Sequence, residues 1–515
     1  MSASPVATTR CGGALERRFA LDVRSLAAHR IGLGVVVTAD ALLRTRDLRL
    51  MFAADGMFPL TALHAYFADP WAWSLATAVD ASWWGAVMLT VEGVAGCLLV
   101  AGCATRVATV IAWIAVVSIL RRTAPATNAG DAWLACLLFW GMFLPLGEAW
   151  SWDGRRGGGH DDPGPSHHAV AAVGRPHRVC SVATAALVLQ IALVYLAAGL
   201  AKWNDCWLSG EAIRHVLSVH DHGSPLGHAL LAGGTGSRPL SWAVVALELL
   251  GPVVLVTCPG PRVRTILVVA FMLFHACCCL LLSVGLFGAI GLAAWLALLP
   301  GEVWDRLGER LSPGGIREAA AGPPRWIGTR LTDALCTVAG AAGLVSLVHD
   351  ATACRDRPLP TVIRHAVALA CLHQEWGMFG VVERQEQWVV ARAELADGSV
   401  VDLLRGGRPF EAERPSGGFS SLPHHRWHKL FWNLPRPRTR VFAEPVAAAL
   451  VRDWNARSND SRRVVSLEIR YARLGRTAED DTLHELLLAT WPPRDAGGRG
   501  SLERILEADT QGAAP

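Results

Sequence analysis

A lysine at the end of a long apolar segment is the residue of this chain best suited to chemistry. Lys202 follows the mostly apolar residues 186–201 and precedes Trp203. A lone ammonium at the edge of a membrane costs about 2.5–3.5 kcal/mol on insertion scales unless it reaches water or a partner. Lysine also becomes a usable base when desolvation favours its neutral form. Lys202 is therefore a candidate base, and an interfacial anchor whose amine reaches the lipid headgroups is the alternative.

Five further ionisable residues lie inside apolar segments: Asp40, Glu92, Asp131, Glu248 and His275. Each is expensive in lipid, so each should face protein or a water-filled interior. Any one of them could form a single hydrogen bond between helices, but five together favour a shared polar cavity. A pairing of Lys202 with either Glu248 or Asp131 would neutralise buried charge, and the sequence leaves both pairings open.

The composition indicates which elements must position these residues. Of 515 residues, 52% are hydrophobic and 18% are charged, which predicts a membrane domain joined to a soluble one. The net charge of +4 gives no basis for nucleic-acid binding. The 13 cysteines lie mostly in apolar runs and form no CxxC pair. The histidines within residues 424–428 lack a complete ligand set, so we expect no bound metal.

Helices of about 20 mostly apolar residues can span a membrane. The sequence predicts an all-α polytopic bundle of about eight or nine spans, at residues 28–43, 84–101, 107–120, 132–146, 182–200, 242–258, 266–282, 285–299 and 331–348. Arginines gather in the loops on the side of the N-terminus, which the positive-inside rule places in the cytoplasm. Lys202 and the C-terminal region then face outward, and we expect a multi-pass protein of the cell (inner, cytoplasmic) membrane.

The chain is expected to divide into five parts. These are a basic cytoplasmic tail (1–25), the transmembrane domain (26–350), a connecting helix with its following element (351–380), a soluble α+β domain (381–500) and a frayed tail (501–515). Within the membrane part, the Gly/Pro/Ser-rich residues 153–166 read as a solvated linker.

The soluble part carries patterns of both strands and helix. Residues 388–395 and 400–404 flank an Asp-Gly pair and predict a β-hairpin. Residues 442–457 predict a helix with Pro445 in its first turn, and residues 464–472 alternate like a half-buried strand. We therefore expect a small α+β domain outside the membrane.

Several strings in fixed order carry a family resemblance. The sequence reads RIGLGVVVTADALLRTRDL at 30–48 with DGMFPL at 55–60, GCATRVATVIAWI at 102–114 with NAGDAWL at 128–134 and WSWD at 150–153, LQIALVYLAAGLAKWNDCWLSGEAI at 189–213, and FMLFHACCCLLLSVGLF at 271–287. LHQEWGMF follows at 372–379. In this combination the chain resembles the vitamin K-dependent γ-glutamyl carboxylase family, within the HTTM-domain membrane proteins, and in particular its bacterial-type members.

The resemblance implies a lyase that uses reduced vitamin K, or menaquinol in a bacterium. In that family the lysine matching Lys202 deprotonates the hydroquinone, which reacts with oxygen to give a strong base. That base removes a proton from a glutamate γ-carbon, which then attacks CO₂. His275 would support the base, and Asp131 lies in the stretch where the animal enzyme has a supporting histidine. The other candidate residues of the quinone and substrate cavity are Glu92, Trp203, Trp207, Gly210 and Glu248, although tryptophans at this level are also typical interface anchors.

Two other function classes are compatible with a membrane bundle. The alternative reading is a non-enzymatic HTTM protein acting as a maturation, assembly or immunity factor, in which Lys202 is a structural charge. A transporter is disfavoured because the two halves show no inverted repeat. The expected partners are a membrane quinone and an extracytoplasmic peptide or small substrate, without nucleic acid.

Overall fold

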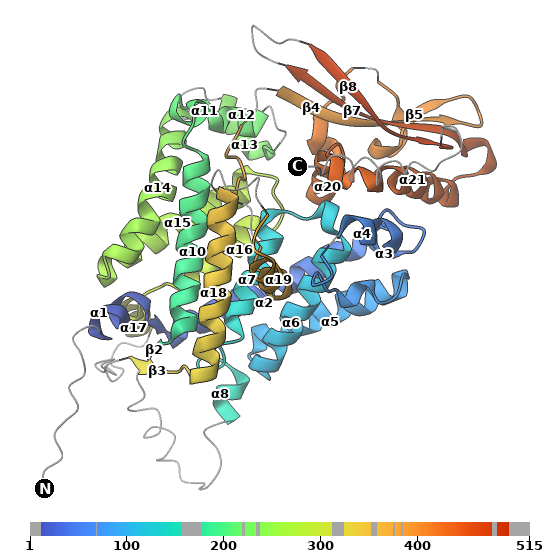
Figure 1. The fold of residues 1–515 in the computed structure, drawn as a ribbon. Coiled ribbons are helices and arrows are strands. Elements are labelled where there is room, and N and C mark those ends of the chain that lie inside the picture. The colour runs from blue at the N-terminus through green and yellow to red at the C-terminus, as the bar shows by residue number, and fades with distance from the viewer. Residues whose placement is uncertain are drawn as a thin grey trace, which may run out of the picture.

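A computed structural model describes residues 12–67, 69–156, 177–218, 222–232, 237–311, 324–351, 358–373, 376–382, 385–411, 413–475 and 482–493. The expected linker at 153–166 lies largely outside these residues, and the expected tail at 501–515 lies wholly outside them. Figure 1 shows a helical bundle with a sheet-containing C-terminal region at one end. This confirms the predicted helical membrane part followed by a smaller mixed one.

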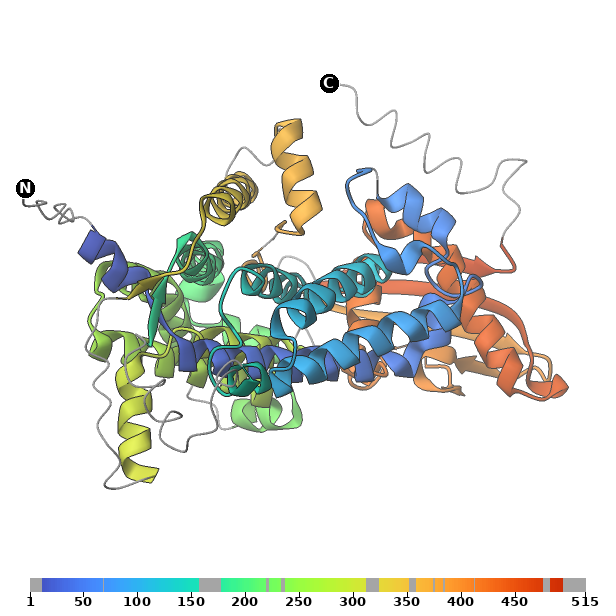
Figure 2. The ribbon, with the colours of Figure 1, turned by 90° about the horizontal axis from the view of Figure 1, so that it is seen from below.

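Every predicted apolar segment overlaps a helix. The helices of the bundle are α2 (Val23–Arg44), α5 (Ser82–Ala101), α6 (Thr105–Arg122), α7 (Ala129–Gly141), α10 (Val182–Ala201), α14 (Ser237–Thr257), α15 (Pro261–Leu281), α16 (Phe287–Leu296) and α18 (Arg330–Ala351). They run between the end that carries α1 (Gly12–Phe19) and the end that carries the C-terminal sheet (Figures 1 and 2).

The predicted count of eight or nine spans is not confirmed. Six helices among the described residues are long and apolar enough to cross a membrane, or up to seven if α16 and α17 (Gly301–Leu311), bent by 85°, count as one span. Two predicted spans fall short for different reasons. The α6 helix includes Arg106, Arg121 and Arg122, and the α7 helix has only 13 residues. Neighbouring helices bury almost all of α7, whereas α6 exposes Val107, Val110 and Ile111.

Local signals fix the starts of the two helices nearest the candidate site. Asn128 caps α7 by accepting from the backbone of Asp131, whose side chain accepts from the backbone N–H of Asn128. Ser181 and Thr184 form the equivalent reciprocal cap of α10. Such capping boxes satisfy backbone donors that a helix start leaves free. The α10 helix then runs to Ala201, which places Lys202 at its C-terminal end.

A small sheet ties the bundle together at the end distant from the C-terminal region. Strand β1 (Leu21–Asp22) pairs antiparallel with β2 (Arg178–Cys180), and β2 pairs parallel with β3 (Arg325–Trp326). The helices α8 (Trp152–Arg156) and α17 lie at this same end (Figure 1). Segments far apart in sequence are thereby joined where the helices α2, α10 and α18 begin.

The C-terminal region is a five-stranded antiparallel sheet with helices on one face. Its strand order is β6-β5-β4-β7-β8, with β4 at Gln385–Leu395, β5 at Val400–Asp402, β6 at Arg408–Pro409, β7 at Val464–Gly475 and β8 at Leu483–Trp491. The predicted hairpin is β4–β5, and Gly398 in its turn has φ 81°. The predicted helix is α21 (Ala443–Arg457), which packs on β7 and β8. The helix α20 (His425–Asn433) lies with α21 between the sheet and the bundle (Figure 1).

The helices α2 and α5 cross at glycines. A Cβ atom at Gly96 would lie 2.4 Å from the Thr38 hydroxyl oxygen and 2.8 Å from the Thr38 nitrogen. At Gly93, three residues earlier in the same helix, a Cβ would lie 3.6 Å from that of Ala41, an ordinary contact. The close approach of the two backbones therefore depends on Gly96.

We expect Gly96→Ala to lower the free energy of unfolding by about 1–3 kcal/mol, because the added methyl group must push the helices apart. The matched control Gly93→Ala should be neutral or slightly stabilising, because alanine favours helix. Thermal unfolding of the purified variants in detergent measures both. Equal midpoints for the two variants would contradict the close crossing.

Candidate cavity in the membrane bundle

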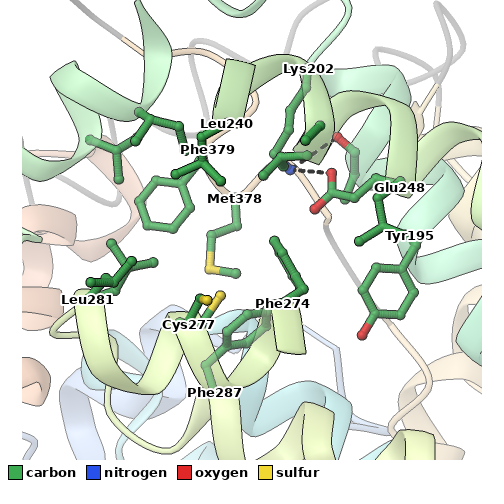
Figure 3. Close-up of a pocket in the computed structure, with 18 of the residues that line it drawn as sticks. Tyr195, Lys202, Leu240, Glu248, Phe274, Cys277, Leu281, Phe287, Met378 and Phe379 are labelled. Atoms are coloured by element: carbon green, nitrogen blue, oxygen red, sulfur yellow. Dashed lines mark hydrogen bonds and ion pairs between the residues drawn. The ribbon is translucent and has the colours of Figure 1, made fainter. Parts of the chain in front are cut away.

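A cavity of about 300 Å³ lies between α10, α14 and α15 near the end that carries the C-terminal sheet. Further walls come from α12 (Ala212–Ser218), from Trp133 of α7 and Phe287 of α16, and from residues 376–379. Figure 3 shows side chains from these elements pointing into one space. Almost all of them are aliphatic, aromatic or sulfur-containing. The exceptions with charge are Lys202 and Glu248.

Lys202 and Glu248 form a buried ion pair in the wall of this cavity. The Lys202 Nζ atom lies 2.8 Å from Glu248 Oε2, and the two residues are 4% and 3% exposed. Lys202 Nζ also donates to the carbonyl of Ala198 at 3.3 Å and lies 5.5 Å from the ring centre of Trp207. Of the two pairings that the sequence left open, the structure has the one with Glu248. The pair is neutral as a unit, which reduces the cost of burying each charge.

The segment that follows the bundle forms one wall of the cavity. Met378 and Phe379 line it, and both belong to the string that the sequence singled out at 372–379. The indole of Trp207 donates to the carbonyl of Phe379 at 2.7 Å, and Asn204 Nδ2 donates to the carbonyl of Gly380 at 2.7 Å. The loop after Lys202 therefore holds this wall in place.

On another side the cavity borders the outer surface of the bundle. Leu240 of α14 and Leu273 of α15 both line it, and they are 36% and 62% exposed. Both helices qualify by length and apolarity as membrane spans. An apolar ligand could therefore pass between the cavity and the hydrocarbon of the membrane without crossing water.

His275 contributes to the cavity through another residue. It is fully buried and shares a hydrogen bond with the hydroxyl of Tyr195, which lines the cavity. Trp295 donates its indole N–H to that hydroxyl oxygen at 2.8 Å. Tyr195, His275 and Trp295 therefore form one hydrogen-bonded group inside the bundle. The Tyr195 hydroxyl points away from Lys202 (Figure 3). The hydrogen bonds among Tyr195, His275 and Trp295 therefore support the cavity wall and do not reach the ion pair.

The cavity residues predicted shortly after Lys202 separate into two groups. Trp207 is buried and lines the cavity beside Lys202. Trp203 is 64% exposed and outside the lining, which fits its alternative reading as an interface anchor. Gly210 is also outside the lining. It adopts φ 80° in a turn against Arg238, where a Cβ would lie 2.5 Å from that side chain, so its role is in the backbone.

Asp131 and Glu92 do not lie in this cavity. Asp131 accepts from Arg426 at 3.1 and 3.2 Å, and Arg426 also pairs with Asp40. Arg44 reaches both aspartates, at 2.8 Å from Asp40 and 3.6 Å from Asp131. The predicted single polar cavity is therefore wrong, because the intramembrane charges divide into two separate clusters.

Glu92 belongs to the second cluster by position. It is fully buried. It interacts electrostatically with Asp40, Arg44 and Arg426. Sequence reasoning missed Arg426, which is 295 residues from Asp131 in the sequence.

The helix α20 docks the C-terminal region on the bundle through its first turn. Beside Arg426, His424 Nε2 lies 2.5 Å from Asp47 Oδ2, and Trp427 donates its indole N–H to Asp47 Oδ1 at 3.1 Å. Burial, and secondly the charge of Arg426, lowers the pKa of His425 to about 4, so this neighbour is neutral at physiological pH. Over the described ranges, no group of three His, Cys, Asp or Glu side chains is placed to hold a metal ion.

A second hollow of about 600 Å³ lies along the outer side of α2 and α5. Its lining includes Thr38, Thr90 and Cys97 among alanine, leucine, valine and glycine residues. No charged residue contributes to it among those that the structure describes. Of these two hollows, only the one at Lys202 offers charge to a ligand.

We expect Arg426→Met to destabilise the protein by about 3–5 kcal/mol, because it leaves Asp40 and Asp131 buried with too little positive charge. Arg408→Met, at an exposed position of the same region, should change the free energy of unfolding by little. Asp131→Asn added to Arg426→Met should restore part of the loss. Denaturant unfolding in detergent measures these changes. Equal free energies of unfolding for Arg426→Met and Arg408→Met would contradict the role of this cluster.

Comparison with known proteins bears on the part of the chain that contains the Lys202–Glu248 pair and the carboxylates of the second cluster. The profile of the HTTM domain matches residues 20–301, a range that includes Lys202, Glu248 and His275. A search of curated proteins and a search of solved structures found no match. Because the matched range covers more than half of the chain, the chain belongs to the HTTM-domain family.

Proposed function

We propose that the protein is a membrane enzyme of the γ-glutamyl carboxylase type, which uses a reduced quinone to abstract a proton from, and carboxylate, an extracytoplasmic peptide or small substrate. The observation that supports this most is the Lys202–Glu248 ion pair, whose charged atoms lie 2.8 Å apart in an otherwise apolar cavity of an HTTM bundle. Such a pair in a site that excludes water is suited to acid–base chemistry.

The residues of the cavity fit a quinone. Aromatic side chains such as Phe274, Phe287 and Phe379 offer faces for a flat ring, and the aliphatic wall extends to the exposed Leu273. A prenyl tail could leave through that side into the membrane. Bound there, menaquinol or reduced vitamin K would supply, with oxygen, the strong base that carboxylation of an unactivated carbon requires. The buried ion pair is the group that could exchange a proton with a ring hydroxyl.

The protein residues have three tasks in this proposal. Lys202 and Glu248 hold and move the proton, and Trp207 limits the freedom of the lysine by packing beside it. The wall of Met378 and Phe379 excludes water from the reacting atoms. Tyr195, fixed by His275 and Trp295, keeps the floor of the cavity in one arrangement.

We also propose an orientation in the cell membrane. The end that carries α1, α8 and α17 is rich in arginine, including Arg155, Arg156, Arg306 and Arg310, so by the positive-inside rule it lies in the cytoplasm. The helix α12, which lines the cavity, and the C-terminal sheet lie at the other end (Figure 1), where a peptide substrate outside the cytoplasm would approach.

Oxygen consumption by the purified protein in nanodiscs tests the proposal. With menaquinol or vitamin K hydroquinone, the wild type should consume oxygen, and Lys202→Ala should lower the rate by at least about 10²-fold, as expected for loss of acid–base catalysis. The only other lysine of the chain, Lys429 in α20, provides the control. Lys429→Ala should keep the rate, because this residue is outside the cavity lining.

Equal oxygen consumption by wild type and Lys202→Ala would contradict the proposal. So would the absence of consumption by a folded wild-type protein. Either result would favour the non-enzymatic reading, in which the bundle and the C-terminal sheet serve a maturation, assembly or immunity factor.

A further inference from the structure

We propose that Glu248 is the proton acceptor of the cavity: it takes the proton of an acidic hydroxyl on a bound apolar ligand, while Lys202 stays protonated and pairs with the resulting oxyanion. This inference rests on the proposed function, in that it assumes a ligand with an ionisable hydroxyl, such as a phenol or hydroquinone. It assigns to Glu248 the role that the family resemblance gives to the lysine.

The geometry of the pair places a carboxylate directly beside the amine. Lys202 Nζ lies 2.8 Å from Glu248 Oε2, and among the described residues this carboxylate is the one charged group within ion-pair distance of the amine. A carboxylate at that distance stabilises the ammonium form of lysine. The geometry therefore places a carboxylate, and not only the amine, where a proton of a bound ligand could be accepted.

The net charge of the cavity is the same before and after the proposed proton transfer. Before the transfer, the cavity holds one carboxylate, one ammonium and a neutral ligand. In the step, the ligand O–H bond breaks and its electron pair stays on the ligand oxygen, while the proton forms an O–H bond on Glu248. Afterwards the cavity holds a neutral carboxylic acid, the same ammonium and an oxyanion. Its net charge remains zero, so no charge has to enter or leave an apolar environment.

The surroundings of the pair make this exchange of partners possible. Both groups line the cavity, so a ligand oxygen can approach either of them. Lys202 is also held by the carbonyl of Ala198 and by the face of Trp207, contacts that are independent of Glu248. When the carboxylate becomes neutral, the ammonium can therefore stay in place and turn its remaining N–H donors to the oxyanion.

A chromophoric phenol tests the inference without any turnover. In 4-nitrophenol, the visible absorption distinguishes the phenolate from the phenol, and the infrared carbonyl band of a protonated carboxylic acid reports on glutamate. At a pH below the ionisation of the free phenol, the wild type in nanodiscs should bind it as the phenolate. The infrared difference spectrum should gain a carboxylic acid band that is absent in Glu248→Gln.

The lysine variants separate the two possible acceptors. Lys202→Arg keeps a cation that cannot act as a base, so it should still yield bound phenolate and the carboxylic acid band, whereas Lys202→Met should yield neither. Phenolate in the wild type without that band, or its loss in Lys202→Arg, would overturn the inference and return the role of acceptor to the lysine. Binding of the neutral phenol by the wild type would overturn it as well.

The phenol experiment and the oxygen-consumption assay can fail independently of each other. Oxygen consumption with quinols tests turnover, whereas the phenol spectra test only the position of one proton. A wild-type protein that ionises the phenol but consumes no oxygen would support the assignment of Glu248 and contradict the carboxylase-type activity. If the wild type consumes oxygen but Lys202→Arg cannot ionise the phenol, the carboxylase-type activity is supported and the assignment of Glu248 is contradicted.

Discussion

A charged side chain inside an apolar bundle costs several kcal/mol unless an opposite charge lies beside it. This constraint organises the protein at two places. At the cavity, Lys202 and Glu248 neutralise each other within the membrane half. At the second cluster, Asp40 and Asp131 need Arg426, which comes from the C-terminal region. The membrane bundle alone therefore leaves buried negative charge, and the C-terminal region completes it.

The two places are linked through the elements between them. The α20 helix that carries Arg426 also places His425 against Gly285, in the turn between α15 and α16, where a Cβ would lie 2.4 Å from the imidazole. Both of these helices contribute to the cavity. From the other direction, Phe379 lies in the cavity wall shortly before strand β4 begins. The C-terminal region is thus in packing contact with elements that form the cavity.

The sequence was most informative where the physics is local. Apolar runs located the helices, and the Asp-Gly turn and alternating strands of the C-terminal region appear as β4, β5 and β7. Span counting was less successful, because α6 carries three arginines and α7 has only 13 residues. The partner of Asp131 was not predictable either. Arg426 is 295 residues away in sequence, and its position among histidines gave it the look of a surface residue.

The sequence indicated the type of chemistry at the candidate site, but not which of the candidate residues line it. Residue type and surroundings pointed to Lys202, and the need to neutralise it limited the partners to two carboxylates, of which the structure has Glu248. Which tryptophan faces inward depends on the turn after α10, which buries Trp207 and exposes Trp203. The hydrogen bonds that join Tyr195 to His275 and Trp295 are contacts between helices that no spacing in the sequence reveals.

The central claim is that the cavity beside the Lys202–Glu248 pair receives the ring of an apolar ligand from the membrane. An experimental structure of the protein in nanodiscs containing menaquinol tests it most directly. The account predicts density for the ring between α10, α14 and α15, with a ring oxygen within hydrogen-bonding distance of the pair and the tail leaving past Leu273. A ring bound in the hollow along α2 and α5, or a cavity filled by its own side chains with the pair separated, would contradict it.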